Sequence, residues 1–189
     1  MLRPILGKPM IFWTLNAVRA SGFSPQDVIV VIGYNVDLMR SWLQKYDSRL
    51  NIVENPNYKN EMFSSIKAGI YHLPEDTRNV LIVLGDQPLV KPETIKAILL
   101  MQNPLKVVQP VYKDKRYHPL LIPESMIEAI RCAPLNCTLK DIMPPPEERI
   151  LVPVDDEGVA LDIDTPDDLK KAESILKIRL QEADEGLAH

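Results

Sequence analysis

Short apolar runs alternate along the chain with longer stretches in which apolar side chains recur every three or four residues. Near-continuous apolar runs are typical of strands buried on both faces of a sheet, and the longer spacing is typical of amphipathic helices. The predicted strands are 28–32, 51–54, 79–84, 106–109 and 150–154. The predicted helices are 9–20, 36–46, 62–71, 92–101, 124–132 and 166–178. Because strands and helices alternate, the pattern predicts an α/β fold with a mostly parallel sheet in a three-layer arrangement.

Residues 111–122 interrupt this alternation. Two strand-like runs flank a charged turn at 113–116, which predicts a small hairpin-like insertion beside the sheet. No linker or repeat divides the chain, so we expect a single domain over residues 1–180 and a frayed polar tail over 181–189. The chain enters its first helix at Pro9, and nothing before it is long enough for the strand that usually opens a doubly wound domain.

Composition narrows the classes of partner. The chain has 189 residues, with 26 acidic and 22 basic side chains and a net charge of −4. A mildly acidic protein repels a phosphate backbone, so we expect no nucleic-acid partner. No apolar run approaches membrane-spanning length and no secretion signal is visible, so we expect no membrane association. Two cysteines do not make a disulfide framework, which favours a reducing, cytoplasmic environment.

The most apolar predicted strand leads directly into Gly85 and Asp86. Ligands of open α/β sheets bind at the carboxyl ends of the strands, and a glycine there lets a ligand approach the backbone. A carboxylate in this position suits Mg²⁺, which takes one or two protein carboxylates and completes its shell with water and phosphate oxygens. An ordinary strand-to-helix turn also favours Gly, Asp and Pro. The tetrapeptide 85–88 (Gly-Asp-Gln-Pro) alone fits a metal site and an ordinary turn equally well.

Asp162 and Asp164 are a second source of carboxylates. They follow the short apolar run 159–161, and strand-like alternation would place both on one face. Carboxylates that converge from two segments can hold a cation between them. The alternative is that they only support the start of the last helix, where Thr165 is the expected N-cap and Pro166 the first helical residue.

Six short motifs follow one another along the chain. They are Gly7-Lys8-Pro9, Asn55-Pro56, the segment 62–69 (Met-Phe-Ser-Ser-Ile-Lys-Ala-Gly), the segment 85–90 (Gly-Asp-Gln-Pro-Leu-Val), His118-Pro119 and the segment 162–169 (Asp-Ile-Asp-Thr-Pro-Asp-Asp-Leu). In this order and spacing they resemble the molybdenum cofactor nucleotidyltransferases, the MobA/MocA-like NTP transferases. The segment 64–67 is most similar to the cytidylyltransferase branch.

The resemblance implies a Rossmann-like nucleotidyltransferase fold and a Mg²⁺-dependent transfer of CMP from CTP to the phosphate of molybdopterin, with release of pyrophosphate. GTP is the nucleotide of the other branch, and a molybdenum enzyme or its chaperone would be a further partner. The implied catalytic residues are Asp86 and Asp164, and the implied metal ligands are Asp86 and Asp162. The implied nucleotide-binding residues are Lys8, Ser64, Ser65, Gly85 and Asp86. The implied acceptor-binding residues are His118, Asp162 and Asp164.

The sequence departs from the family pattern at its start and at several later positions, among them Glu61. Family members begin with a strand and a glycine-rich loop that cradles the triphosphate, and this chain has neither ahead of its first helix. Glu61 stands where the family usually has glycine. Two alternatives follow: a nucleotidyltransferase that uses another phosphorylated acceptor, such as a sugar phosphate, or a catalytically silent member that binds or carries the cofactor.

Overall fold

Strands and helices alternate along most of the chain, as the apolar pattern predicts. The computed structural model describes residues 3–134 and 136–186. Its strands are β1 (Pro4–Ile5), β2 (Lys8–Pro9), β3 (Ile29–Ile32), β4 (Asn51–Glu54), β5 (Asn79–Ile82), β6 (Val108–Tyr112), β7 (Lys115–Arg116), β8 (Leu120–Pro123) and β9 (Ile150–Pro153). Its α-helices are α1 (Met10–Ala20), α2 (Val36–Tyr46), α3 (Glu61–Ile70), α4 (Pro92–Leu100), α5 (Glu124–Cys132), α6 (Leu139–Ile142) and α7 (Pro166–Gly186). Short 3-10 helices are η1 (Pro25–Asp27), η2 (Pro146–Glu148) and η3 (Glu157–Ala160).

The strand pairing is mixed, which corrects the expectation of a mostly parallel sheet. β3 and β4 pair in parallel, and β9 runs parallel to β6. β8, however, lies between β5 and β6 and is antiparallel to both. The segment 120–123 therefore enters the middle of the sheet and does not lie beside it. The physical reason is burial, because Leu120, Leu121 and Ile122 are all nearly inaccessible to solvent.

The charged turn predicted at 113–116 forms a small hairpin. β6 and β7 are antiparallel, with Tyr112 opposite Lys115. The two turn residues, Lys113 and Asp114, both have positive φ, at 48° and 61°. Positive φ at both central residues is the conformation whose twist matches that of the flanking strands.

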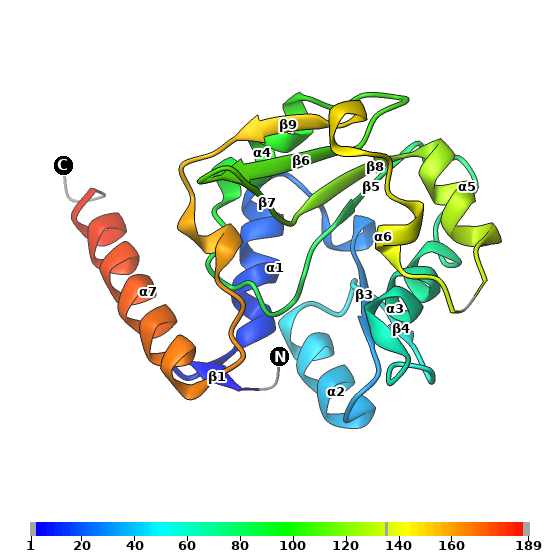
Figure 1. Ribbon diagram of the computed structural model, residues 1–189. Coiled ribbons are helices and arrows are strands. Elements are labelled where there is room, and N and C mark those ends of the chain that lie inside the picture. The colour runs from blue at the N-terminus through cyan, green and yellow to red at the C-terminus, as the bar shows by residue number, and fades with distance from the viewer. Residues whose placement is uncertain (1–2, 135, 187–189) are drawn as a thin grey trace.

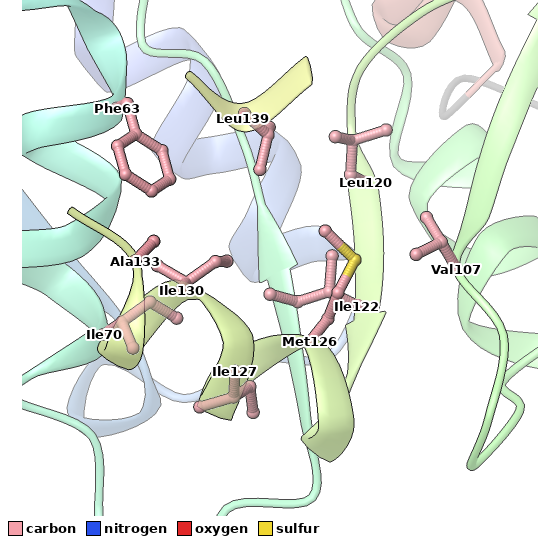
Figure 2. Close-up of a cluster of buried hydrophobic side chains, with 10 residues drawn as sticks. All are labelled: Phe63, Ile70, Val107, Leu120, Ile122, Met126, Ile127, Ile130, Ala133 and Leu139. Carbon is pink, nitrogen blue, oxygen red and sulfur yellow. The ribbon is translucent and has the colours of Figure 1, made fainter. Parts of the chain in front are cut away.

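Helices cover both faces of the sheet that contains β5. Along β5, Val80 and Ile82 pack against the cluster formed by α3 and α5, whereas Leu81 packs against residues of α1 and α4. Successive side chains of a strand point to opposite faces, so this alternation confirms three layers. Figure 2 shows the first cluster, in which Phe63 and Ile70 of α3 lie opposite Ile127 and Ile130 of α5.

α7 lies along one side of the molecule (Figure 1). Its start is capped as predicted: the Thr165 hydroxyl donates to Asp168 Oδ2 at 2.6 Å and accepts the Asp168 N–H at 3.2 Å. Its apolar face packs on Ile5 and Leu89 through Ala172 and Leu176. The helix continues to Gly186, into the segment predicted to fray, and residues 187–189 lie outside the described part of the chain.

The described helices include none that combines the length and apolar character needed to cross a membrane.

Candidate active site

The carboxyl ends of β3, β4 and β5 point toward the lower part of the molecule in the view of Figure 1. Two groups of candidate residues lie there. The group that we call the β5 side comprises Asp86, Gln87, His118, Asp162 and Asp164. The group that we call the α3 side comprises Asn55, Asn57, Glu61, Ser64 and Ser65, at the end of β4 and the start of α3.

Two segments far apart in the sequence are held together on the β5 side. The Ile163 N–H donates to the carbonyl oxygen of Asp86 at 3.2 Å. Asp156, which is 1% exposed, accepts hydrogen bonds from the Lys91 N–H at 2.8 Å and the Thr94 hydroxyl at 2.7 Å. A side chain on Gly158 would lie 2.1 Å from the carbonyl oxygen of Leu89, so only glycine permits this approach. These contacts fix residues 162–164 beside Asp86.

Gln87 links the two segments directly. Its side chain is 3% exposed, and its Nε2 donates to Asp162 Oδ1 at 2.8 Å and to the carbonyl oxygen of Val159 at 3.2 Å. Its Oε1 is buried and has no hydrogen-bond partner among the described residues. A buried acceptor without a partner costs free energy, so this oxygen suits a donor that a bound ligand or water supplies.

Asp86 lies in an environment that opposes its charge. Burial raises the pKa of its carboxyl, and the negative charges of Asp162 and Asp164 raise that pKa further. Within the described residues, none of these three carboxylates forms an ion pair. A divalent cation would relieve both the burial cost and the repulsion, and hard carboxylate oxygens are the ligands that Mg²⁺ prefers.

The acidic residues therefore fit a metal ion that draws most of its ligands from elsewhere. Across residues 3–134 and 136–186, the structure contains no cluster of three or more His, Cys, Asp or Glu side chains that could hold a metal. Mg²⁺ does not require such a cage, because it commonly keeps water and phosphate oxygens in its shell. The arrangement suits a metal that arrives with a polyphosphate.

His118 stands near the same carboxylates. Burial lowers the pKa of its imidazole, and this effect is opposed by a hydrogen bond to the backbone of Ile82 and by the charge of Asp162. The lowered pKa favours the neutral ring at pH 7. Its Nδ1 is buried and has no partner among the described residues, so this nitrogen can hydrogen-bond a ligand.

Asp164 is the second of the two aspartates that follow η3. Its carbonyl oxygen accepts a hydrogen bond from Arg3 Nη1 at 3.2 Å. Ile163, between the two aspartates, is 6% exposed, whereas Asp162 and Asp164 are both exposed. The alternation predicted from the sequence is thus present, although residues 161–164 form no strand.

A hydrogen-bond network organises the α3 side. Asn55 is 3% exposed, and its Nδ2 donates to Ser64 Oγ at 2.8 Å and to Ser65 Oγ at 3.0 Å. The Ser64 hydroxyl lies 3.0 Å from the carbonyl oxygens of both Asn57 and Glu61, to which it can donate. Ser64 is therefore fully occupied by the protein, while the partly exposed Ser65 keeps donor capacity for a ligand.

Glu61 adopts a backbone conformation that glycine prefers. Its φ is 53°, in the left-handed region, where an L side chain costs roughly 1–2 kcal/mol. This conformation gives a physical reason for the glycine at the matching family position. Glu61 thus keeps, at the start of α3, a left-handed backbone conformation that suits glycine.

Lys8 and Gly85 are the two remaining predicted residues. Lys8 is exposed on β2, and its Nζ lies 5.5 Å from the centre of the Trp13 ring. Gly85 follows β5, and its carbonyl oxygen lies 3.5 Å from the Thr14 hydroxyl.

The MobA-like NTP transferase domain matches residues 1–149. The chain belongs to this family. Among curated relatives, the bifunctional protein GlmU of Thermoanaerobacter pseudethanolicus is 27% identical over 143 residues, which is 69% of this chain and 28% of that protein. The GlmU protein of Parvibaculum lavamentivorans is 32% identical over 95 residues, 50% of this chain and 20% of the relative. The chain thus spans less than a third of these relatives.

Solved structures show the same fold as this MobA-like protein. Rv0371c from Mycobacterium tuberculosis H37Rv has a TM-score of 0.74 at 21% identity, covering 92% of this chain and 88% of that one. The same protein has also been solved in complex with manganese. Molybdopterin-guanine dinucleotide biosynthesis protein A from Archaeoglobus fulgidus has a TM-score of 0.62 at 19% identity, covering 93% and 89%. The Rossmann-like nucleotidyltransferase fold is confirmed.

Sequence reasoning left two side chains of this MobA-like site without roles. Asn55 and Gln87 both stand inside motifs that carried the family resemblance. The sequence feature that could have identified them is a polar residue shortly after an apolar strand and directly before a proline. Such a residue is expected to be buried and hydrogen-bonded, and both are.

Proposed function

We propose that this MobA-like protein is a Mg²⁺-dependent cytidylyltransferase that transfers CMP from CTP to the phosphate of molybdopterin. The observation that carries the proposal is the joining of Asp86 and Asp162 through Gln87, at the carboxyl end of a buried strand. A carboxylate pair held at this edge of an α/β sheet suits a metal-bound triphosphate.

The reaction balances without any oxidant or further reactant. A phosphate oxygen of molybdopterin attacks the α-phosphorus of CTP and forms a new P–O bond. The bond from that phosphorus to the bridging oxygen of the β-phosphate breaks, and pyrophosphate leaves. Position and charge neutralisation supply most of the rate enhancement in such transfers.

Asp86 and Asp162 would hold the metal, which neutralises charge on the triphosphate when bound. Asp164 would act beside them at the acceptor phosphate. His118, whose lowered pKa favours the neutral ring, would hydrogen-bond the acceptor through Nδ1. Gly85 would allow the nucleotide to approach the backbone.

Ser64 and Ser65 would lie on the nucleotide side. Ser65 would donate to the base or ribose, and Ser64 would act by fixing the loop. Lys8 is the remaining candidate for a phosphate contact. The proposal includes a cytoplasmic location, a single domain over residues 1–180 and hand-over of the product to a molybdenum enzyme or its chaperone.

A different phosphorylated acceptor, such as a sugar phosphate, is the second candidate substrate. Asp86 and Asp162 would hold a metal equally well for any reaction at the α-phosphate of a nucleotide. A catalytically silent member of the family would bind nucleotide or cofactor and release no pyrophosphate.

The test is calorimetric titration of CTP, with and without Mg²⁺, into the wild-type chain and the Asp86→Asn variant. We expect Mg²⁺-dependent binding that weakens by more than about 100-fold in the variant, since second-shell changes alone cost about 10- to 100-fold. The matched control is Asp76→Asn, an exposed aspartate before the other end of β5, which should bind as the wild type does. Equal Mg²⁺-dependent binding by wild type and Asp86→Asn would refute the metal assignment.

Pyrophosphate release then distinguishes the acceptors. The proposed activity requires release with molybdopterin and CTP. Release only with a sugar 1-phosphate would favour the second substrate, and Mg²⁺-dependent binding without release from either acceptor would favour a silent member.

A further inference from the structure

Two tyrosines that the proposed chemistry does not use lie at the same edge of the molecule. Tyr34 follows β3 and Tyr58 follows β4, and these strands are parallel neighbours. Their ring centroids are 6.5 Å apart at an interplanar angle of 62°, an edge-to-face pair. Tyr34 is 69% exposed and Tyr58 is 36% exposed. A pair so exposed contributes little to the core, so its position calls for another reason.

The side chain of Tyr58 packs directly against the backbone of Gly33. A Cβ atom on Gly33 would lie 2.2 Å from the Cβ of Tyr58, so any other residue would displace the tyrosine. The Tyr58 N–H donates to the carbonyl oxygen of Asn55 at 3.3 Å, and the Asn57 N–H donates to Asn55 Oδ1 at 2.9 Å. Because Asn55 is itself buried, the loop that carries Tyr58 is fixed to the end of β4.

The structure supports Tyr34 from one side and leaves the other side open. Asn35, directly after it, has a φ of 50°, a conformation that asparagine tolerates and that turns the chain into α2. Tyr58 meets the Tyr34 ring edge to face. The Nζ of Lys59 lies 6.0 Å from the Tyr58 centroid and places a positive charge beside the pair.

A supported, exposed aromatic face is suited to a flat heterocycle. Stacking of a base on an aromatic side chain tolerates any base, because each base has a π face. Hydrogen-bonding groups for the edge of such a ring stand nearby, since Asn55 connects the Tyr58 loop with Ser65. The neighbouring positive charge suits a ligand that carries phosphates.

We propose that Tyr34, supported by Tyr58, stacks the base of the nucleotide. This inference rests on the proposed function and adds the subsite for the heterocycle. The nucleotide is favoured over the acceptor because the tyrosines share the Asn55 network with the nucleotide-side Ser64 and Ser65. The acceptor-side candidates His118, Asp162 and Asp164 all belong to the β5 side.

The experiment separates base recognition from phosphate recognition. CTP, GTP and inorganic tripolyphosphate, each with Mg²⁺, are titrated calorimetrically into the wild type and into Tyr34→Ala, Tyr34→Phe and Tyr71→Ala. Stacking on an aromatic side chain corresponds to about a 5- to 150-fold change in affinity per base. We therefore expect Tyr34→Ala to lose about 5- to 150-fold in affinity for CTP and GTP and no affinity for tripolyphosphate.

The other variants are matched controls. Tyr34→Phe keeps the ring and should bind both nucleotides within about 2-fold of the wild type, since the stacking face is retained. Tyr71 is 59% exposed at the opposite end of α3, and Tyr71→Ala should leave nucleotide affinity unchanged. Thermal unfolding of each variant verifies that the fold is retained.

The outcomes separate this inference from the function on which it rests. Mg²⁺-dependent nucleotide binding that is equal in wild type and Tyr34→Ala would overturn the stacking subsite and leave the proposed function standing. An equal loss for nucleotides and tripolyphosphate would also overturn the subsite, because the effect would not involve the base. Failure of the wild type to bind either nucleotide would overturn both proposals together.

Discussion

The β5 side and the α3 side of the candidate site are built in opposite ways. The hydrogen bond from Gln87 to Asp162 joins residues 75 positions apart, whereas the one from Asn55 to Ser64 joins residues nine apart. The β5 side concentrates negative charge around a partly buried carboxyl, and the α3 side presents neutral amides, hydroxyls and aromatic rings. The proposed metal and acceptor side thus depends on tertiary contacts, while the Asn55 network of the proposed nucleotide side depends on a local motif.

This contrast predicts which property a substitution in each side would change. A substitution on the β5 side should change metal affinity, because two segments that are distant in the sequence must be held side by side there. A disturbance on the α3 side should change the stability of one loop and helix start. Substitutions in the two sides therefore need different measurements.

After Asp86→Asn, Gln87→Ala should have the largest effect on metal affinity. Gln87 orients Asp162, and second-shell partners of metal ligands typically alter metal affinity by about 10- to 100-fold. We expect a loss of this size in Mg²⁺-dependent CTP binding, measured by titrating Mg²⁺ at constant CTP. The exposed Gln102 is the control, and Gln102→Ala should behave as the wild type does. Unchanged Mg²⁺ dependence in Gln87→Ala would show that this contact does not organise the metal ligands.

Asn55→Ala should lower stability more than metal affinity. The substitution removes the donor that the two serine hydroxyls share, and the loss of this partner at the buried Ser64 costs about 1–3 kcal/mol. Urea unfolding should show this decrease, with tripolyphosphate binding retained. Asn60→Ala is the control, because Asn60 is exposed and its side chain makes no capping hydrogen bond at the start of α3. If Asn55→Ala were as stable as Asn60→Ala, the network would not hold the α3 side together.

Glu61→Gly should raise stability. Glycine relieves a left-handed conformation that costs about 1–2 kcal/mol but adds roughly 0.5–1 kcal/mol of backbone entropy, leaving a gain of about 0.5–1 kcal/mol. Chemical unfolding measures the gain. Glu75→Gly, at an exposed position without positive φ, should show no gain. A loss of stability in Glu61→Gly would mean that the glutamate side chain has contacts that outweigh the strain.

The sequence predicts the local parts of this protein better than the long-range ones. The helix 36–46 and the capped start of α7 follow from apolar spacing and from Thr165 and Pro166, and the structure confirms them. The central position of β8 between β5 and β6 was not predicted, because a hairpin pattern over 111–122 does not determine which other strand a buried run such as 120–122 will pair with. Residues 157–160 form a 3-10 helix that overlaps the short apolar run 159–161.

The candidate site shows the same difference between local features, which the sequence predicts, and long-range contacts, which it does not. Convergence of Asp86 with Asp162 was expected from two motifs that each follow an apolar run, and the structure brings their segments together through Ile163 and Gln87. The link through Gln87 could not be predicted, because it depends on how η3 packs on residues 87–91. The tyrosine pair has no sequence signal, since its two members meet only when β3 and β4 align.

The smallest predicted effect concerns the stability of the β5 side as pH changes. Burial raises the pKa of Asp86 above its unfolded value of 3.8, and the charges of Asp162 and Asp164 add to this shift. Between 3.8 and the raised value, the folded protein binds more protons than the unfolded chain, so folding stability falls as pH rises through that window. Asparagine does not titrate and removes this dependence.

We therefore expect Asp86→Asn to gain stability over the wild type as pH rises from 4 to 7 without metal, by less than about 1 kcal/mol. Urea unfolding at both pH values measures the difference. Asp76→Asn, at the other end of β5, should show a constant difference. Added Mg²⁺ should reverse the order at pH 7, because a metal that binds only the folded wild type stabilises it by mass action. A difference that does not change with pH would mean that Asp86 is well solvated, and the contrast between the two sides would then rest on geometry alone.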